Sequence, residues 1–218
     1  MTAAVPTIFV VDDDAPVRKS LTRLLTAAGY AVEAFASARE FLASLRPPGA
    51  GCLVLDVNMP GLSGLDLQKA LASSPHQLSI VFVTGHGDIQ MGVRAMKSGA
   101  VDFLTKPYDD SDLLDAINRA VAKDARDLGV EARVADMKER VKLLTPRETE
   151  VFALVVTGML NKQIAGALGI GEKTVKVHRA RVMEKMGVRS VAELVSLCGA
   201  DIVARASAAQ HREAASAG

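Results

Sequence analysis

Short apolar segments, most of which end in a polar or charged residue, recur along the first half of this sequence. Between them lie stretches whose apolar residues follow helical spacing. Strands are expected at 8–12, 31–35, 52–56, 79–84 and 101–104, with helices at 15–28, 37–45, 64–73, 89–98 and from about 110. Strands and helices that alternate in this way predict an α/β fold with a doubly wound, five-stranded parallel sheet.

Polar side chains at the ends of these strands are expected to meet, because the carboxyl ends of parallel strands share one edge of a sheet. The first strand ends at the pair Asp12 and Asp13, and the third ends at Asp56. The fourth ends at Thr84, and Lys106 follows the fifth. Each residue alone is common in turns, caps and surface loops. Their occurrence together at one edge predicts a site that handles a phosphoryl group.

Asp56 is the candidate phosphoacceptor, because it ends the central strand and a carboxylate can act as a nucleophile. A divalent cation would neutralise the charges that repel an incoming phosphoryl group. Lys106 would pair with one phosphoryl oxygen, and Thr84 would donate a hydrogen bond to another. Hard oxygen ligands favour Mg²⁺ (or Mn²⁺). The candidate ligands are the carboxylates of Asp12, Asp13 and Asp56 and the backbone carbonyl of Asn58.

The alternative from the enzyme class is a hydrolase that forms an aspartyl phosphate on Asp12. Such enzymes favour an Asp-x-Asp motif followed by small residues. Here Asp14 is followed by Ala15 and Pro16, and the acceptor-like Asp56 lies on a later strand. The sequence therefore favours a switch that catalyses only its own phosphoryl transfer and loss.

The second half of the sequence is expected to be all-α, with four short helices at 146–157, 161–168, 172–186 and 190–198. Within it, residues 161–180 fit the spacing of a helix-turn-helix, with Ala165 at the helix crossing, Gly169 in the turn and Val175 packed into the angle. A basic helix of this kind can enter the major groove of DNA. The candidate DNA contacts are Lys173, Thr174, Lys176, Val177, Arg179 and Arg181. The alternative is a helical module that binds protein.

A long helical linker is expected between the two halves, since only Gly129 interrupts a helix-forming stretch over 110–143. Its apolar residues follow heptad spacing. This stripe would either pair with its copy in a dimer or pack on the chain's own domains. The stripe consists of Val130, Val134, Met137, Val141 and Leu144.

Composition limits the remaining possibilities. Hydrophobic residues make up 49% of the chain, which disfavours global disorder, and the absence of Trp disfavours a stacking platform for single-stranded nucleic acid. Neither a signal peptide nor a membrane-spanning run is visible, so we expect a cytoplasmic protein without membrane contact. The expected domains are 1–122 and 144–203, joined by the linker 123–143 and followed by a disordered tail at 204–218.

Residues 5–122 resemble the receiver domain of bacterial two-component response regulators. The matching segments are Val-Val-Asp-Asp at 10–13, Leu-Asp-Val-Asn-Met-Pro-Gly at 55–61, Val-Thr-Gly-His-Gly-Asp at 83–88 and Lys-Ser-Gly-Ala-Val-Asp-Phe-Leu-Thr-Lys-Pro at 97–107. The resemblance implies a flavodoxin-like fold, phosphorylation of Asp56 by a sensor histidine kinase, and Mg²⁺ near that residue. It also implies a switch in which Phe103 swings inward when Thr84 moves toward the phosphoryl group.

Residues from Thr145 onward resemble the LuxR-type helix-turn-helix, and the FixJ-like subfamily is the most similar over nearly the full chain. The matching segments are Thr-Pro-Arg-Glu-Thr-Glu-Val at 145–151, Asn-Lys-Gln-Ile-Ala at 161–165 and Thr-Val-Lys-Val-His-Arg at 174–179. The resemblance implies base contacts from Lys176 and Val177, whereas Ala180 replaces a basic residue that is frequent in the family. The implied partners are double-stranded promoter DNA, a second copy of the chain when phosphorylated, and RNA polymerase as a further candidate.

Overall fold

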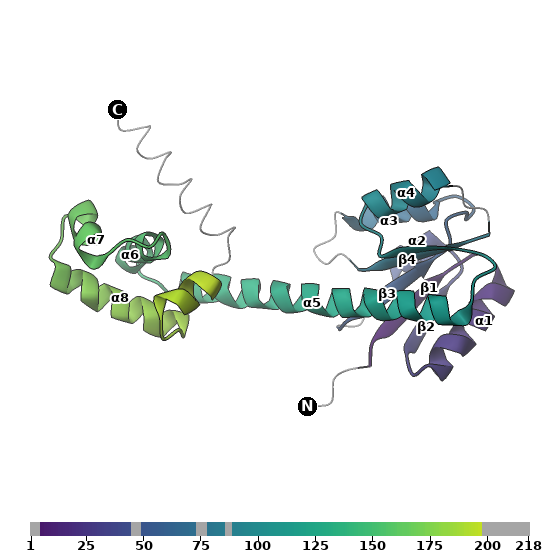
Figure 1. Cartoon of the computed structure of the whole chain (residues 1–218), viewed down its shortest axis with the longest axis horizontal. Helices are drawn as coiled ribbons and strands as arrows, with labels where there is room; N and C mark the ends of the chain where they lie inside the picture. The colour runs from purple at the N-terminus through teal and green to yellow at the C-terminus, as the bar shows by residue number, and fades with distance from the viewer. Residues whose placement is uncertain (1–4, 45–48, 73–77, 86–88, 198–218) are drawn as a thin grey trace. The chain divides into compact units, whose positions relative to one another are not determined.

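The computed structural model of the chain describes residues 5–44, 49–72, 78–85 and 89–197. The chain divides into two compact units, unit 1 (Met1–Gly129) and unit 2 (Val130–Gly218) (Figure 1). The tail expected at 204–218 lies outside the described residues, as do Cys198 and His86. Among the described helices, none is long and apolar enough to cross a lipid bilayer.

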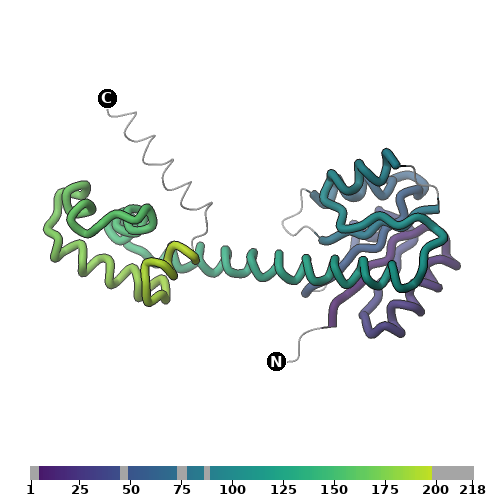
Figure 2. The backbone as a smooth tube through the Cα atoms, viewed as in Figure 1, coloured from purple at the N-terminus to yellow at the C-terminus, as the bar shows by residue number. Residues whose placement is uncertain are grey.

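Unit 1 is built around a parallel sheet in the order β2-β1-β3-β4-β5. This is the strand order of flavodoxin-like sheets, whose ligand site lies at the carboxyl edge between β1 and β3. Figure 2 shows β1, the first strand of the chain, in the interior of the sheet. The expected α/β fold is confirmed, and each strand lies within one residue of its expected range. The strands are β1 (Thr7–Val11), β2 (Ala31–Phe35), β3 (Gly51–Leu55), β4 (Ile80–Thr84) and β5 (Asp102–Thr105).

Helices cover both faces of this sheet. Successive strand residues point to opposite faces, so each face has its own apolar core. On one face, Phe9 and Phe82 pack with Phe41 of α2 and with apolar residues of α3 and α4. On the other, Val54 packs with Ile117 of α5 and with apolar residues of α1. The helices are α1 (Ala15–Ala27), α2 (Ala38–Ala43), α3 (Gly64–Ala72), α4 (Ile89–Lys97) and α5 (Asp110–Lys142), whose last turns belong to unit 2.

Unit 2 is all-α and contains α6 (Pro146–Val156), α7 (Asn161–Leu168) and α8 (Glu172–Met186), followed by helical residues 191–197. α7 ends at Gly169, whose φ of 64° is left-handed, and Val175 at the start of α8 is fully buried. The expected helix-turn-helix is therefore present. The hydrophobic core of unit 2 also contains Val182 and Met186 from α8.

The heptad stripe expected on the linker divides into two parts. Val130 and Val134 are 49% and 37% exposed. Met137, however, is 1% exposed, and it joins Leu144 and Val141 in the hydrophobic cluster of unit 2. The second part of the stripe is thus used inside unit 2, and only the first two positions remain open to another partner.

The start of α6 is held by a capping box formed by Thr145 and Glu148. The Glu148 Oε2 accepts the backbone N–H of Thr145 at 2.8 Å, and the Thr145 hydroxyl accepts the Glu148 N–H at 3.3 Å. Lys185 of α8 donates to the same Glu148 oxygen at 2.6 Å. These hydrogen bonds lower the pKa of the Glu148 carboxyl to about 2, and the bond from Lys185 has the largest effect.

Unit 2 should therefore lose stability as the pH falls from about 4.5, the ordinary pKa of glutamate, to about 2. A carboxyl whose pKa is lowered by folding stabilises the folded state only while it is ionised. The Glu148→Gln variant keeps a capping oxygen but cannot ionise, so its stability should change less over this window. Thermal unfolding at a series of pH values measures the difference. The control is Glu150→Gln on the exposed side of the same helix, which should follow the wild-type profile; identical profiles for all three proteins would contradict the assignment.

Candidate functional site

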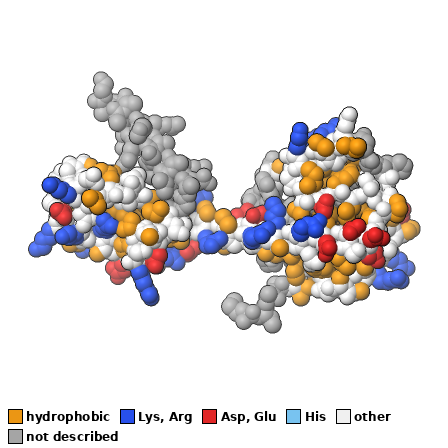
Figure 3. Space-filling model, viewed as in Figure 1, with side chains coloured by type: hydrophobic (Ala, Val, Ile, Leu, Met, Phe, Trp, Pro, Cys, Tyr) orange, Lys and Arg blue, Asp and Glu red, His pale blue; other side chains and the backbone are white. Residues whose placement is uncertain are grey.

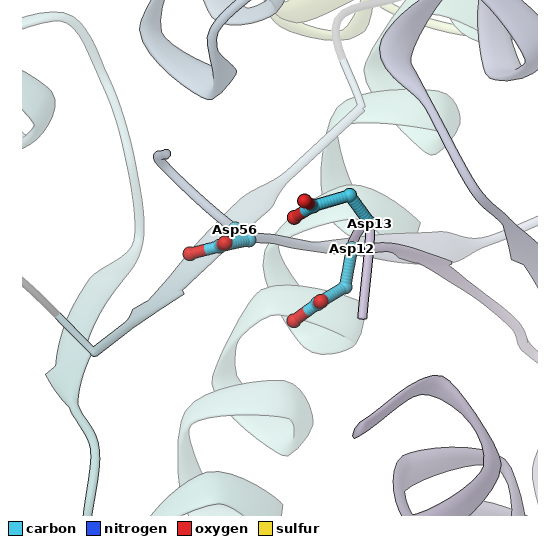
Figure 4. Close-up of side chains that lie close together, drawn as sticks. All are labelled: Asp12, Asp13 and Asp56. Atoms are coloured by element: carbon cyan, nitrogen blue, oxygen red, sulfur yellow. The ribbon is translucent and has the colours of Figure 1, made fainter. Parts of the chain in front are cut away.

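Three carboxylates meet at the carboxyl edge of the sheet in unit 1. Asp12 and Asp13 follow β1, and Asp56 follows β3, the neighbouring strand. One oxygen from each of the three lies within 4.8 Å of the others. Figure 4 shows the three side chains extending to the same side of the strand ends. The sequence prediction that they converge is therefore confirmed in position.

Lys106 and Thr84 lie at the same edge. The Nζ atom of Lys106 is 2.9 Å from Oδ2 of Asp12, and the backbone N–H of Lys106 donates to the Thr84 carbonyl at 2.8 Å. Thr84 is fully buried, and the Lys106-Pro107 peptide bond is cis. An open pocket at this edge is lined by Asp12, Asp13, Asp14, Val17, Asp56, Asn58, Thr84, Gly85 and Lys106. The structure thus brings together every residue of unit 1 that the sequence assigned to the phosphoryl site, except Phe103.

Asp12 is fixed through its side chain and its backbone. Besides the bond from Lys106, its Oδ1 accepts the N–H of Asp14 at 2.8 Å, and its backbone carbonyl accepts a bond from the Arg18 guanidinium at 2.6 Å. The residue is 2% exposed. Asp12 therefore has both carboxylate oxygens engaged, and it holds the lysine at the edge of the pocket.

Asp56 is held by its backbone, and one of its carboxylate oxygens has no hydrogen-bond partner in the part of the chain that the structure describes. Its N–H donates to the Val11 carbonyl at 2.9 Å, which continues the pairing of β1 and β3. A side chain at Gly64, at the start of α3, would collide with the Asp56 carbonyl, so the glycine lets the helix begin against this segment. Among the described residues, no group hydrogen-bonds the buried Oδ1 of Asp56.

The electrostatic environment disfavours a charge on Asp56. Burial raises the pKa of the Asp56 carboxyl, and the negative charge of Asp12 raises it further. The Lys106 ammonium and the backbone amides of Asn58 and Val57 act in the opposite direction but do not cancel the shift. A bound cation at this edge would relieve the same repulsion.

The residues present fit a hard divalent cation. A buried carboxylate oxygen without a hydrogen-bond partner is costly, and a metal ion can satisfy it. The donor set around it consists of carboxylate oxygens, which are ligands typical of Mg²⁺ and Mn²⁺ and not of soft metals.

Phe103 lies on β5, which β4 separates from β3 and the acidic cluster. It is half-buried on β5, and its ring centroid is 6.1 Å from that of Phe82. A Cβ added to Gly92 of α4 would lie 3.4 Å from the Phe103 ring, so α4 passes close to it. The aromatic ring is thus placed between the sheet and α4.

The candidate DNA contacts lie on α8 of unit 2. Five of them are exposed, namely Lys173, Thr174, Lys176, Val177 and Arg181. Arg179 differs, because it is half-buried and donates to the Asn161 side chain of α7 at 2.8 Å. Lysine and arginine side chains lie on the surface over α7 and α8 (Figure 3).

Comparison with known families identifies the two parts of the chain. Residues 8–118 match the family described as the response regulator receiver domain, and residues 142–198 match the bacterial regulatory proteins of the luxR family. This chain belongs to the response regulators with a LuxR-type domain. It combines a receiver domain with a LuxR-type DNA-binding domain, and the relatives that resemble it include the transcriptional regulatory protein FixJ.

Full-length relatives share both parts of this response regulator. The Nodulation protein W of Bradyrhizobium diazoefficiens is 51% identical over 190 residues, which cover 87% of this chain and 84% of the relative. The transcriptional regulatory protein FixJ of the same organism is 43% identical over 190 residues, with 87% and 93% covered. The solved structure of the response regulator StyR matches with a TM-score of 0.75 at 50% identity, covering 89% of this chain and 98% of that one.

Two contacts of this response regulator were not expected from the sequence. Arg18, in the first turn of α1, donates to the Asp12 carbonyl. Asp124 of α5 accepts hydrogen bonds from backbone N–H groups at the opposite, amino edge of the sheet. Neither residue belongs to a motif or to an apolar pattern. A charged residue on an otherwise polar helix face carries no sequence signal for a partner that lies far away in the chain.

Proposed function

We propose that this response regulator accepts a phosphoryl group on Asp56 from a sensor histidine kinase and then binds promoter DNA through α8. The observation that carries the proposal is the unpartnered buried oxygen of Asp56 beside the carboxylates of Asp12 and Asp13. The proposed domains are the receiver at 1–122, the linker at 123–143 and the DNA-binding domain at 144–203. The protein would catalyse only its own phosphoryl transfer and loss.

In the transfer step, a carboxylate oxygen of Asp56 bonds to phosphorus while the nitrogen of the kinase phosphohistidine leaves. Mg²⁺ (or Mn²⁺), held by the carboxylates of Asp12, Asp13 and Asp56 and by the Asn58 carbonyl, would supply charge neutralisation. Lys106 would release Asp12, its present partner, and pair with a phosphoryl oxygen. The negative charge of the phosphoryl group would then be compensated by the lysine and by the cation held at the acidic edge.

Thr84 and Phe103 are proposed to convert phosphorylation into a change of shape. Thr84 ends β4 at the pocket, so its hydroxyl would donate to the phosphoryl group. Phe103 lies on β5, which pairs with β4, and its ring packs near α4. A shift of Thr84 would open space for the ring, and the altered surface would favour a homodimer.

In the DNA-bound state, α8 would lie in the major groove. Lys176 and Val177 would contact bases, while Lys173, Thr174, Arg179 and Arg181 would contact phosphates. Arg179 would do so from a position fixed by Asn161. RNA polymerase is a further candidate partner of the bound dimer.

Binding to a labelled promoter fragment should tighten when the protein is phosphorylated by acetyl phosphate in the presence of Mg²⁺. Fluorescence anisotropy at fixed salt measures the dissociation constant, since affinity for DNA depends strongly on salt. Lys176→Ala should weaken binding by about 1–3 kcal/mol. Lys138→Ala, an exposed lysine on α5, is the matched control and should bind as the wild type does. Affinity that is unchanged by phosphorylation, or by Lys176→Ala, would contradict the corresponding part of the proposal.

A further inference from the structure

Asp124 is a fully buried carboxylate that the phosphoryl site does not use. It lies on the part of α5 that belongs to unit 1 and is 0% exposed. Its Oδ2 accepts the backbone N–H of Gly51 at 2.9 Å, and its Oδ1 accepts that of Ser79 at 3.2 Å. A buried charge is costly unless hydrogen bonds compensate it, and these two bonds to backbone N–H groups contribute to that compensation.

The two backbone N–H groups that donate to Asp124 belong to, or directly precede, the strands that lead to the phosphoryl site. Gly51 is the first residue of β3, which leads to Asp56, and Ser79 immediately precedes β4, which ends at Thr84. The Leu53 N–H donates to the Ser79 carbonyl at 2.9 Å, which ties the two strand starts together. One side chain therefore holds the amino ends of both strands whose carboxyl ends form the site.

Close packing around these hydrogen bonds restricts movement at the start of β3. A Cβ added to Gly51 would lie 2.7 Å from the Thr7 carbonyl of β1. Cys52, the next residue, is 0% exposed, and its pKa is raised by burial and then by the negative charge of Asp124. A displacement of β3 or β4 along its length would thus have to stretch the bonds to Asp124 or carry α5 with it.

α5 continues from this point without interruption. Residues 129–136 are exposed, and the next residue, Met137, is buried in the core of unit 2. Asp124 is therefore the last fully buried residue of the helix in unit 1 before it enters unit 2. Its hydrogen bonds to Gly51 and Ser79 link the start of the site strands directly to that helix.

We propose that Asp124 is a positioning residue that couples the phosphoryl site to the helix that enters unit 2. The inference rests on the proposed function, because it requires that phosphorylation of Asp56 changes DNA affinity. A shift of β3 and β4 at the phosphoryl group is carried along the hydrogen-bonded strands to their amino ends, where Asp124 transmits it to α5. Coupling of this kind is a free energy shared by two sites, so loss of the link should reduce the effect of one site on the other.

The test uses the ratio of the DNA dissociation constants of the unphosphorylated and phosphorylated full-length protein. Asp124→Asn keeps one acceptor oxygen but presents an amide N–H₂ to the other backbone donor, and Asp124→Ala removes both acceptors. We expect either substitution to lower this ratio by roughly ten-fold, the usual effect of losing a charge-assisted hydrogen bond. If the wild-type ratio is itself below about ten, the ratio of the variants should fall to near one. Labelling of Asp56 by acetyl phosphate should persist. Asp127→Asn, a half-exposed carboxylate one turn further along α5, should keep the wild-type ratio.

Alkylation of Cys52 in a Cys198→Ser background separates coupling from folding. The Cys52 thiol stays protected from alkylation in a variant whose sheet is intact at the start of β3. If the thiol of Asp124→Ala reacts, that variant has unfolded there, and the ratio measured for Asp124→Asn alone decides the test. A protected, labelled variant with the wild-type ratio would overturn the inference. If the wild type itself showed no labelling, or no change in DNA affinity, the proposed function would fail instead. If Asp127→Asn lowered the ratio equally, the effect would belong to the charge of α5 and the role of Asp124 would be rejected.

Discussion

Asp56→Asn should abolish phosphoryl labelling by acetyl phosphate, while unit 1 remains folded. An amide cannot form an acyl phosphate, and Asp56 has the one carboxylate oxygen in the pocket that is buried without a hydrogen-bond partner among the described residues. Intact-protein mass spectrometry and phosphate-affinity electrophoresis, each with Mg²⁺ present, measure the label.

The fold should tolerate this change because ionised Asp56 is unfavourable where it lies. Burial and the charge of Asp12 raise its pKa, so the folded state holds the proton more tightly than the unfolded chain does. The resulting penalty is absent below the ordinary pKa of aspartate and develops as the pH rises above it. At neutral pH, Asp56→Asn should therefore unfold at the same temperature as the wild type or at a higher one.

Two further variants complete this experiment. Asp66→Asn changes an exposed aspartate on α3 that bonds Ser63 and Lys69 outside the pocket, and it should be labelled normally. Asp12→Asn tests the hydrolase alternative, in which Asp12 would carry the phosphoryl group. We expect Asp12→Asn to slow labelling without removing the acceptor, because both Asp12 oxygens are engaged by Asp14 and Lys106. Full labelling of Asp56→Asn would rule out Asp56 as the acceptor.

The phosphoryl site could be predicted from the sequence because its residues are placed by the sheet. Asp56 and Thr84 each lie at the end of a run of apolar residues that is buried on both faces, and strand direction alone brings such ends together. The cluster of carboxylate oxygens at that edge is present as predicted, and it is the basis for proposing Mg²⁺ there. The alternation of strands with helices predicted the parallel sheet. The order of its strands was not predicted from that pattern and is a finding of the structure.

The contacts of Asp124 and Arg18 could not be predicted in this way. Asp124 bonds residues 73 and 45 positions away in the chain, and its helix continues with charged residues that are exposed. Local pattern gives no information on which charged residue of such a helix is buried. The partner is fixed only when the helix is docked on the sheet, because the spacing of β3 and β4 then decides which residue reaches both backbones.

The role of the heptad stripe on the linker could not be predicted for a different reason. Apolar residues spaced by three and four positions describe equally the seam of a coiled coil and the buried face of a single packed helix. The structure resolves this by burial, since Met137 is enclosed by the core of unit 2 whereas Val134 is 37% exposed. The choice depends on residues of α6 and α8 that no local pattern of α5 contains.

Met137→Ala should accordingly destabilise unit 2 by about 2–5 kcal/mol, the usual cost of truncating a buried methionine. The side chain is 1% exposed and belongs to the same cluster as Val151 of α6 and Val182 of α8. Urea unfolding of the full-length protein, with hydrogen exchange used to assign the transition to α6 and α8, measures the change. The DNA affinity should fall with the stability of this core, since α8 carries the candidate contacts.

Val134→Ala is the matched control, because it occupies the preceding position of the same stripe. An exposed substitution of this kind should change stability by less than about 0.5 kcal/mol. Light scattering on both variants, phosphorylated and unphosphorylated, separates the two uses of the stripe. If the stripe formed a dimer seam, both variants would weaken dimerisation and leave the α6 and α8 transition unchanged. Because Met137 is already enclosed within its own unit, we expect the opposite result, in which only Met137→Ala alters that transition.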